Sequence, residues 1–157
     1  MERRIDLAAM AKLNHDYARS IDEDALEAWP SFFAETCLYR ITTADNHARG
    51  FEAGLIYADT RAMLEDRVKS LRIANIYERH RYRHILGMPA LGEGSGPDIR
   101  CETAFVVIRI MRDGALTVFA TGKYLDRVRA DSDRLVFAER IVVCDNANID
   151  AMLALPL

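Results

Sequence analysis

The sequence lacks the hallmarks of several classes of protein. No apolar run approaches the roughly 18 residues of a membrane-spanning helix, so no membrane span is expected. The 24 acidic side chains slightly outnumber the 21 basic ones, which gives a formal net charge of −3. A chain with this balance has no general attraction to nucleic acid or to an anionic membrane. Internal repeats and low-complexity tracts are also missing, so a repeat protein is not expected.

Cysteine is scarce and poorly placed for a structural or catalytic role. The 3 cysteines, Cys37, Cys101 and Cys144, are odd in number and far apart, which argues against a disulfide framework. None begins a Cys-x-x-Cys or Cys-x-His motif. Each lies among apolar or β-branched residues, so we predict small, buried side chains. The first residues form a polar amphipathic segment without an apolar signal region, and a cytoplasmic location is therefore expected.

The composition is that of ordinary globular proteins. Of the 157 residues, 50% are hydrophobic and 29% are charged. A chain of this length can bury a core of its own. The longest loop-like interval, residues 87–98, is rich in glycine and too short to divide domains. We therefore predict a single domain over residues 1–157.

Apolar spacing and turn residues divide the chain into helices and strands. Loops are expected over residues 45–50 and, as an exposed excursion, over residues 87–98. The apolar tail over residues 151–157 must dock on the domain. The predicted order is a helix over 5–19, a broken helix over 20–34, strands over 36–43 and 55–57, a helix from 59 or 60 to 74, and a strand over 79–86.

The broken helix is predicted from its capping residues and its proline. Ser20 and Glu23 have the spacing of a capping box, with Asp22 as a competing cap. Pro30 would remove a hydrogen bond from the helix interior, so we predict a break near Trp29 with a new turn directly after it.

Three extended runs follow, and they predict an antiparallel meander. Asp113-Gly114 between apolar flanks is a strong hairpin signal, since both central positions of the favoured turn need positive φ. A second turn is predicted over residues 130–133, which are polar. The runs cover residues 101–112, 115–126 and 134–145.

Both faces of this meander are apolar, whereas a sheet with one face in water should alternate apolar and polar residues. We infer that helices of the chain cover one face and that another subunit covers part of the other. A closed barrel or a strong curl is the alternative. On the first run the two faces are Ala104, Val106, Ile108 and Ile110 against Phe105, Val107 and Met111; on the last they are Leu135, Phe137, Ile141 and Val143 against Val136, Ala138, Val142 and Cys144.

This order of elements predicts an α+β protein in which about three helices cover one side of a curved antiparallel sheet. By analogy, the arrangement is that of the nuclear-transport-factor-2-like cone.

Residues 79–84 contain the most concentrated candidate chemistry. His80 and His84 have the i, i+4 spacing of zinc ligands on a helix, but the surrounding residues favour a strand and a third ligand is missing. Strand alternation places Arg79, Arg81 and Arg83 on the opposite side from the histidines. We expect these cations to pair with carboxylates of this chain or of a partner, rather than to bind a metal, phosphate or nucleic acid.

A cone fold can also carry an acid/base enzyme in its apolar pocket. The candidates lie on or beside predicted strands: Tyr39, Asp45, His84 and Glu139. The structural alternative is that Asp45 caps a turn and that Glu139 forms an ion pair on the sheet surface.

Several segments resemble the small (beta) subunit of aromatic-ring-hydroxylating dioxygenases. The specific motif is Asp59 followed by Met63-Leu64-x-x-Arg67 and then by Arg83-His84 at the head of a strand. Residues 29–33 and 139–145 support the resemblance to the family. Residues 45–50, 74–87 and 154–157 are similar to its terephthalate branch.

The resemblance implies a structural subunit of an oxygenase with three large and three small subunits. In such enzymes the large subunit carries a Rieske 2Fe-2S cluster and a mononuclear Fe(II), a reductase supplies electrons from NADH, and both atoms of dioxygen add to the ring of an aromatic dicarboxylate. No catalytic, cofactor-binding or metal-binding residue is therefore expected here. The outer sheet face and the strand over residues 79–84 are expected to contact the large subunit. The alternative is a stand-alone isomerase or dehydratase acting on a small hydrophobic substrate.

Overall fold

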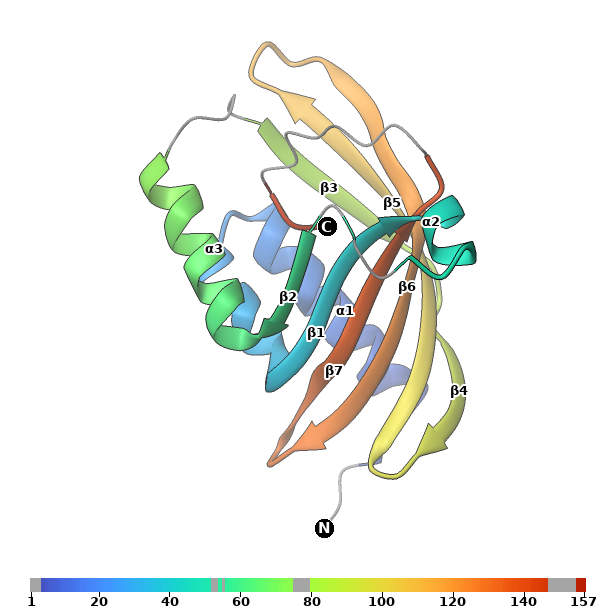
Figure 1. Ribbon diagram of the computed structural model, residues 1–157. Helices are drawn as coiled ribbons and strands as arrows, with labels where there is room; N and C mark the ends of the chain where they lie inside the picture. Colours follow the sequence, from blue (N-terminus) through green and yellow to red (C-terminus); the bar gives the residue numbers. More distant parts are fainter. Residues whose placement is uncertain (1–3, 52–53, 55, 75–79, 147–154) are drawn as a thin grey trace.

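The computed structural model describes residues 4–51, 54, 56–74, 80–146 and 155–157 (Figure 1). Its helices are α1 (Leu7–Asp22), the 3₁₀-helix η1 (Leu26–Phe32), α2 (Ala44–Ala48) and α3 (Arg61–Ala74). Its strands are β1 (Phe33–Thr43), β2 (Ile56–Thr60), β3 (His80–Leu86), β4 (Ala90–Ser95), β5 (Asp98–Met111), β6 (Leu116–Asp131) and β7 (Arg134–Cys144).

Within the described part of the chain, the strands form one 7-stranded sheet. The order is β2-β1-β7-β6-β5-β3, with β4 paired to the first half of β5. Antiparallel pairing of β5 with β6 and of β6 with β7 confirms the predicted meander. β1 joins β7 in parallel, which the prediction of an antiparallel sheet did not include. The sheet is curved and open, with β2 and β3 at its two ends, so the closed-barrel alternative is wrong.

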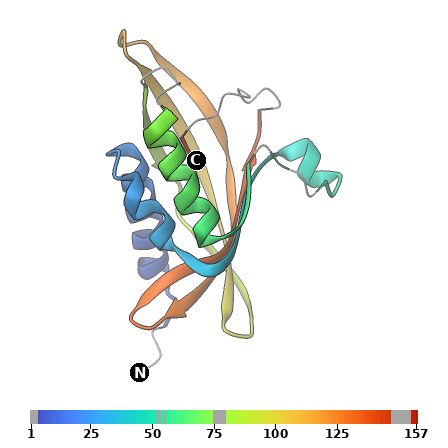
Figure 2. The same ribbon diagram turned by 60° about the vertical axis from the view of Figure 1, so that its left-hand side comes forward.

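Helices α1 and α3 lie on one side of the sheet, which we call the inner face, while α2 lies on the other side (Figure 2). The core fills the space between the inner face and the helices. Its largest members include Tyr17 of α1, Trp29 of η1 and Leu64 of α3, all with 0% exposure. These observations confirm the α+β class and the helical cover over one face.

The first helix is longer than predicted, and the capping box is wrong. α1 continues through Ser20, whose buried hydroxyl donates to the Tyr17 carbonyl oxygen. Glu23 lies after the last turn and pairs with Arg19 instead of capping a new helix. The N-terminal cap is Asp6, which accepts from the Ala9 amide at 2.8 Å.

Pro30 does not break the second helix at Trp29. This segment is a 3₁₀-helix that runs through Pro30 to Phe32. A short helix of this kind tolerates a residue without an amide hydrogen, and Trp29 and Pro30 are both buried against the core. The predicted turn after Trp29 is therefore absent from this described segment, and β1 begins at Phe33.

Two predicted loops contain regular structure. Residues 44–48 form the short helix α2, capped by the Thr43 hydroxyl, which accepts from the Asn46 amide. Within the excursion after Gly87, β4 pairs with β5 although it contains two glycines, because β5 offers a free edge there. Leu55 and Arg79, which were predicted to begin two of the strands, lie outside the described residues.

The helix α3 and the first hairpin follow their local signals. Thr60 caps α3 by accepting from the Met63 amide at 3.2 Å. In the hairpin between β5 and β6, Gly114 has a φ of +88°, but Asp113 is not in the positive-φ region. The turn is therefore a glycine-bulge type and not the expected type with both central residues at positive φ.

Bulges decide which strand residues face the core. Strand β7 carries one extra residue, Ala138, opposite the neighbouring β6 residues Arg127 and Val128. The side chains of β7 therefore change faces at this bulge. Phe137 and Val142 belong to the core, and Ile141 and Val143 are buried on the opposite, outer face. The predicted grouping of Phe137 with Ile141 is therefore wrong, whereas the predicted faces of β5 are confirmed. Among the described residues, no helix is long and apolar enough to cross a membrane.

Candidate interaction surface

Strand β3 separates its side chains as its sequence predicts. Tyr82 and His84 are buried on the inner face, while Arg81 and Arg83 are exposed on the outer face. β3 is an edge strand, and the Asp22 carboxylate of α1 accepts a hydrogen bond from its His84 amide at 2.8 Å. This contact satisfies one main-chain donor of the free edge.

A patch of apolar side chains covers the outer face of β3, β5 and β6. Cross-strand pairing joins Ile85 to Val106, Ile108 to Val118 and Ile110 to Leu116. Exposure is 57% for Ile85, 66% for Leu116 and 65% for Val118. We call these residues the outer-face patch: Ile85, Val106, Ile108, Ile110, Leu116 and Val118.

Two cations border the outer-face patch. Arg83 is paired across the strands with Ile108, and Arg81 with Ile110. Among the described residues, neither guanidinium has an ion-pair partner. A contiguous apolar surface with a polar rim is typical of a protein interface. The strand predicted to contact a partner therefore lies beside exposed apolar side chains.

The structure does not bring the predicted acid/base residues together. Tyr39 is fully buried on the inner face, whereas Glu139 lies on the outer face and pairs with Arg127. Asp45 is exposed in the first turn of α2. The predicted surface ion pair of Glu139 is confirmed, and Asp45 belongs to a helix and not to a turn.

His84 is paired within the chain. Its Nδ1 lies 2.6 Å from the Asp22 Oδ1, so the ring is oriented by a carboxylate. His80 lies four residues before His84 on the same face of β3, and the Tyr82 ring between them packs against both imidazoles. Over the described ranges, no group of three or more His, Cys, Asp or Glu residues is close enough to hold a metal ion.

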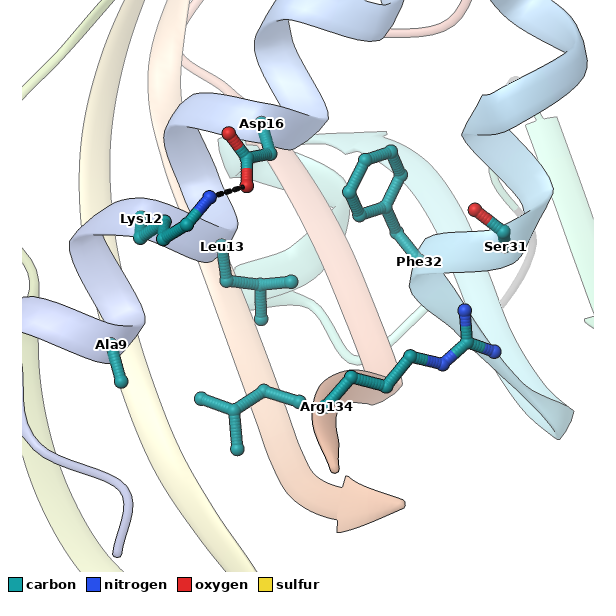
Figure 3. A pocket seen from close by; sticks show the side chains of 8 residues that line it. Ala9, Lys12, Leu13, Asp16, Ser31, Phe32 and Arg134 are labelled. Carbon is teal, nitrogen blue, oxygen red and sulfur yellow. Dashed lines mark hydrogen bonds and ion pairs between the residues drawn. The ribbon is translucent and has the colours of Figure 1, made fainter. Parts of the chain in front are cut away.

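Two grooves are found on the surface of the described residues. One, of about 230 Å³, lies between α1, η1 and β7 (Figure 3). Its Lys12 and Asp16 pair with each other, and the rest of its lining includes Leu13 and Phe32. A second groove, of about 330 Å³, runs between α1 and the end of β3 and includes His84 and Asp22.

Sequence reasoning missed a buried ion pair at the centre of the molecule. Arg140 and Asp126 are joined by two hydrogen bonds of 2.8 Å, and both side chains have 0% exposure. The guanidinium also donates to the Asn14 side chain and stacks on Tyr124, with Cζ 3.8 Å from the ring centroid. Burial raises the pKa of the Asp126 carboxyl, although Arg140 acts in the opposite direction. The bulge in β7 turns Arg140 inward, and no local signal revealed it.

The described end of the predicted apolar tail, residues 155–157, packs inside the core, whereas residues 151–154 lie outside the described part of the chain. Leu157 is fully buried, and its carbonyl oxygen accepts hydrogen bonds from the hydroxyls of Tyr17 at 2.7 Å and Tyr39 at 3.0 Å. The Leu157 amide donates to the Tyr39 hydroxyl at 3.2 Å. Tyr39, a candidate catalytic residue in the sequence, therefore holds the chain's own main chain.

All three cysteines are buried free thiols, as predicted. Burial raises the pKa of Cys37 to about 11 and that of Cys144 to about 12. Protonated, buried thiols are weak nucleophiles and poor metal ligands.

Comparison with known proteins identifies a family that the chain resembles over most of its length. Residues 16–151 match the family model described as ring hydroxylating beta subunit. The chain is 49% identical, over 94% of its length and 96% of the relative, to the beta 1 subunit of the terminal oxygenase component of terephthalate 1,2-dioxygenase from a Comamonas species. It is 36% identical to the small subunit of anthranilate 1,2-dioxygenase from Burkholderia cepacia, over 92% of this chain and 90% of the relative.

A solved structure shows the same fold. It is a beta subunit assigned to an aromatic-ring-hydroxylating dioxygenase from Novosphingobium aromaticivorans, with a TM-score of 0.88 and 31% identity, covering 96% of each chain. The match of the family model over most of the chain, together with these relatives, shows that the chain belongs to the beta subunits of aromatic-ring-hydroxylating dioxygenases.

Proposed function

We propose that this chain is the structural beta subunit of an oxygenase that dihydroxylates terephthalate. The supporting observation is its 49% identity with the beta subunits of terephthalate 1,2-dioxygenase, which spans nearly the whole of both chains. The chain acts in the cytoplasm as a single domain over residues 1–157.

The chain itself contributes no catalytic residue. A Rieske 2Fe-2S cluster takes two cysteine and two histidine ligands. Cys37, Cys101 and Cys144 are separate buried thiols, and no metal-holding cluster is found among the described residues, so this chain does not fit that group. In this proposal the large subunit carries the cluster and the mononuclear iron, and a reductase supplies electrons from NADH.

The contribution of the chain is a rigid surface that holds large subunits together, in an assembly of three large and three small subunits. The outer-face patch is the contact surface, because Ile85, Leu116 and Val118 are exposed there beside two cations, Arg81 and Arg83, that have no ion-pair partner among the described residues. Burying a side chain such as Leu116 in an interface is worth about 1.5 to 3 kcal/mol. The rim cations Arg81 and Arg83 fit carboxylates of the partner.

The test is charge reversal at the rim. Arg81→Glu and Arg83→Glu together should reduce co-purification with the co-expressed large subunit at least about tenfold, which corresponds to roughly 1.4 kcal/mol. Arg134→Glu is the matched control, since Arg134 is an exposed cation in the hairpin between β6 and β7, away from the patch. Equal recovery of all variants would mean that the large subunit binds elsewhere.

A further inference from the structure

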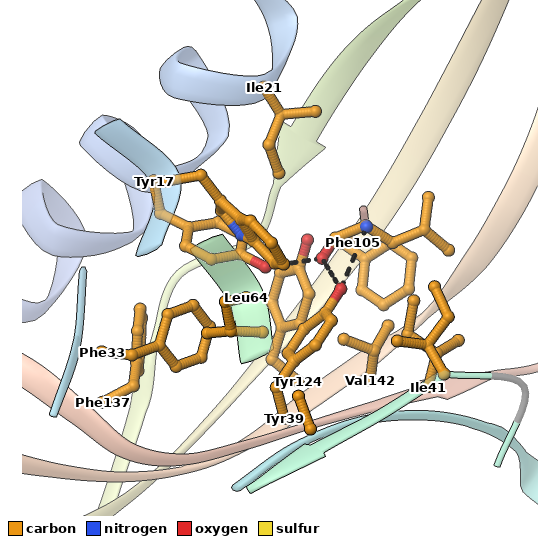
Figure 4. Packing of buried hydrophobic residues seen from close by; sticks show 14 of the residues in the cluster. Tyr17, Ile21, Phe33, Tyr39, Ile41, Leu64, Phe105, Tyr124, Phe137 and Val142 are labelled. Atoms are coloured by element: carbon orange, nitrogen blue, oxygen red, sulfur yellow. Dashed lines mark hydrogen bonds between the residues drawn. The ribbon is translucent and has the colours of Figure 1, made fainter. Parts of the chain in front are cut away.

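The groove between α1 and the end of β3 has one wall from each element. The core-facing side of α1 carries Tyr17 and Ile21, which point into the buried cluster (Figure 4). Another side of the helix lines the groove with the small side chains of Ala11 and Ala18, and the end of β3 contributes Leu86. The volume of about 330 Å³ is at the lower end of the range for pockets that hold a bound group. The groove is therefore large enough for a side chain of a partner.

Polar side chains in the lining of this groove are already held by bonds within the chain. Asn14 donates to the Thr103 hydroxyl at 3.0 Å and accepts from the buried guanidinium of Arg140. The Asp22 carboxylate holds both the ring and the amide of His84. These walls are therefore fixed before a partner arrives, which lowers the entropic cost of binding.

The bond between Asp22 and the His84 amide also excludes one kind of occupant. Among the described strands, β3 lies at one end of the sheet, where a partner could add a further strand by main-chain hydrogen bonds. At the groove, however, the Asp22 carboxylate already accepts from the edge amide of His84. An added strand would have to break this bond, so the groove is better suited to side chains of a partner.

Arg83 connects the groove with the outer-face patch. It belongs to the lining of the groove, and it is paired across the strands with Ile108 of the patch. On the other wall Arg19 pairs with Glu23, whereas Arg83 has no ion-pair partner among the described residues. The groove therefore offers apolar surface and one available positive charge, which together are complementary to an apolar side chain beside a carboxylate.

An exposed methionine adds apolar surface at the same wall. Met88 lies between the lining residues Gly87 and Pro89, and it is 79% exposed. The flexible thioether of methionine adapts to the shape of a partner. Exposed apolar side chains are thus found both in the outer-face patch and beside the groove.

We propose that the interface with the large subunit continues from the outer-face patch around β3 into this groove. A segment of the large subunit inserts an apolar side chain between α1 and β3, and a neighbouring carboxylate of that segment pairs with Arg83. This inference rests on the proposed function, because it takes the large subunit as the partner. It adds a second contact region, on α1, to the one on the sheet.

Cysteine labelling measures whether the groove is covered in the complex. The native thiols are all buried, so one introduced, exposed thiol can be followed alone. Labelling of Ala11→Cys by a maleimide should slow at least about tenfold on assembly with the large subunit, because a thiol buried in an interface is shielded from the reagent. Ala62→Cys, at an exposed alanine of α3, is the matched control and should react equally in both states.

Two results of the labelling experiment would overturn the proposal. One is equal labelling of Ala11→Cys in the free and the assembled small subunit, which would mean that the groove stays open. The other is slow labelling in the free small subunit already, with a dimer in light scattering, which would place a second copy of this chain in the groove.

A groove-filling variant measures whether the contact contributes to assembly. When variant and wild-type small subunits compete for a limiting, tagged large subunit, Ala11→Trp should be incorporated at least about tenfold less than the wild type, because its indole occupies the space of the partner side chain. Ala62→Trp should be incorporated like the wild type. Circular dichroism of the free variants checks that both are folded, and the labelling experiment remains decisive if Ala11→Trp is not.

The same competition separates this inference from the proposed function. Incorporation of Ala11→Trp at the wild-type level, with exclusion of the doubly substituted patch variant Leu116→Asp and Val118→Asp, would overturn the groove contact and leave the proposed function intact. Failure of the wild-type small subunit itself to assemble with the large subunit would instead contradict the proposed function.

Discussion

Arg140 shows how strongly a single residue can constrain the interior of this fold. Its guanidinium is fully buried, bonded to Asp126 and Asn14, and stacked on the rings of Tyr124 and Phe137. A buried charge of this kind adds little net stability over an apolar pair, but it is costly to leave unpaired. The ion pair therefore fixes which face of β7 points inward.

Removing one partner of this pair tests that reading. Asp126→Ala should lower the free energy of unfolding by about 3 to 5 kcal/mol, because Arg140 is left buried without a counter-ion. Urea denaturation followed by circular dichroism measures the loss. Glu102→Ala is the control, since it breaks an exposed pair with Lys123 and should cost no more than about 1 kcal/mol. Similar losses for the two variants would contradict the account.

The buried thiols give a pH-dependent prediction. Burial raises the pKa of Cys144 to about 12 from an ordinary value of 9.0. The folded state therefore favours the protonated thiol, and this contribution to stability is complete below pH 9 and is lost as the pH rises beyond it. At pH 8 the folded chain should react with an aromatic disulfide reagent far more slowly than the chain in urea. Rapid labelling of the folded chain would show that the thiols are accessible.

At the scale of elements, strands β6 and β7 pack too closely at one point for any side chain. A Cβ added at Gly122 would collide with the carbonyl oxygen of Val143 on the neighbouring strand. Only glycine fits there without a shift of the backbone. The pairing of Gly122 with Cys144 therefore depends on the absence of a side chain.

Gly122→Ala should destabilise the chain by about 1 to 3 kcal/mol, the usual cost of overpacking. Gly92→Ala in β4 is the matched control, because the nearest atom to its added Cβ would be the Arg100 Cβ at an ordinary 3.4 Å. Thermal unfolding of both variants measures the difference. A Gly122→Ala variant with unchanged thermal stability would show that β6 and β7 can separate slightly without destabilising the chain.

The elements that could be predicted from sequence were those specified locally. Helix α3 begins at its Thr60 cap, and Gly114 marks the hairpin between β5 and β6. β4 could not be predicted, because its glycines give no strand signal and its pairing depends on β5. The inward position of Arg140 depends on a bulge, which shifts the period-2 pattern without a signature in composition. The placement of Tyr39 and Glu139 on opposite faces of the sheet likewise depends on the fold, so it could not be predicted from the sequence.

At the scale of the whole molecule, the two apolar faces of the sheet have different roles. The inner face builds the core with α1, η1 and α3, and the chain's own Leu157 completes it. In the outer-face patch, Ile85 of β3 and Leu116 and Val118 of β6 remain exposed while the β5 members are partly buried, although exposing such side chains forgoes about 1.5 to 3 kcal/mol each. A subunit that works by holding a partner has a use for that surface.

The most direct test of the account is assembly with the large subunit when the patch is made polar. Leu116→Asp and Val118→Asp together should abolish the hetero-oligomer in size-exclusion chromatography with light scattering, and leave the folded small subunit eluting alone. Ile73→Asp on α3, at an exposed apolar position away from the patch, should leave assembly intact. A full-sized complex containing the doubly substituted patch would contradict the central claim that this face binds the large subunit.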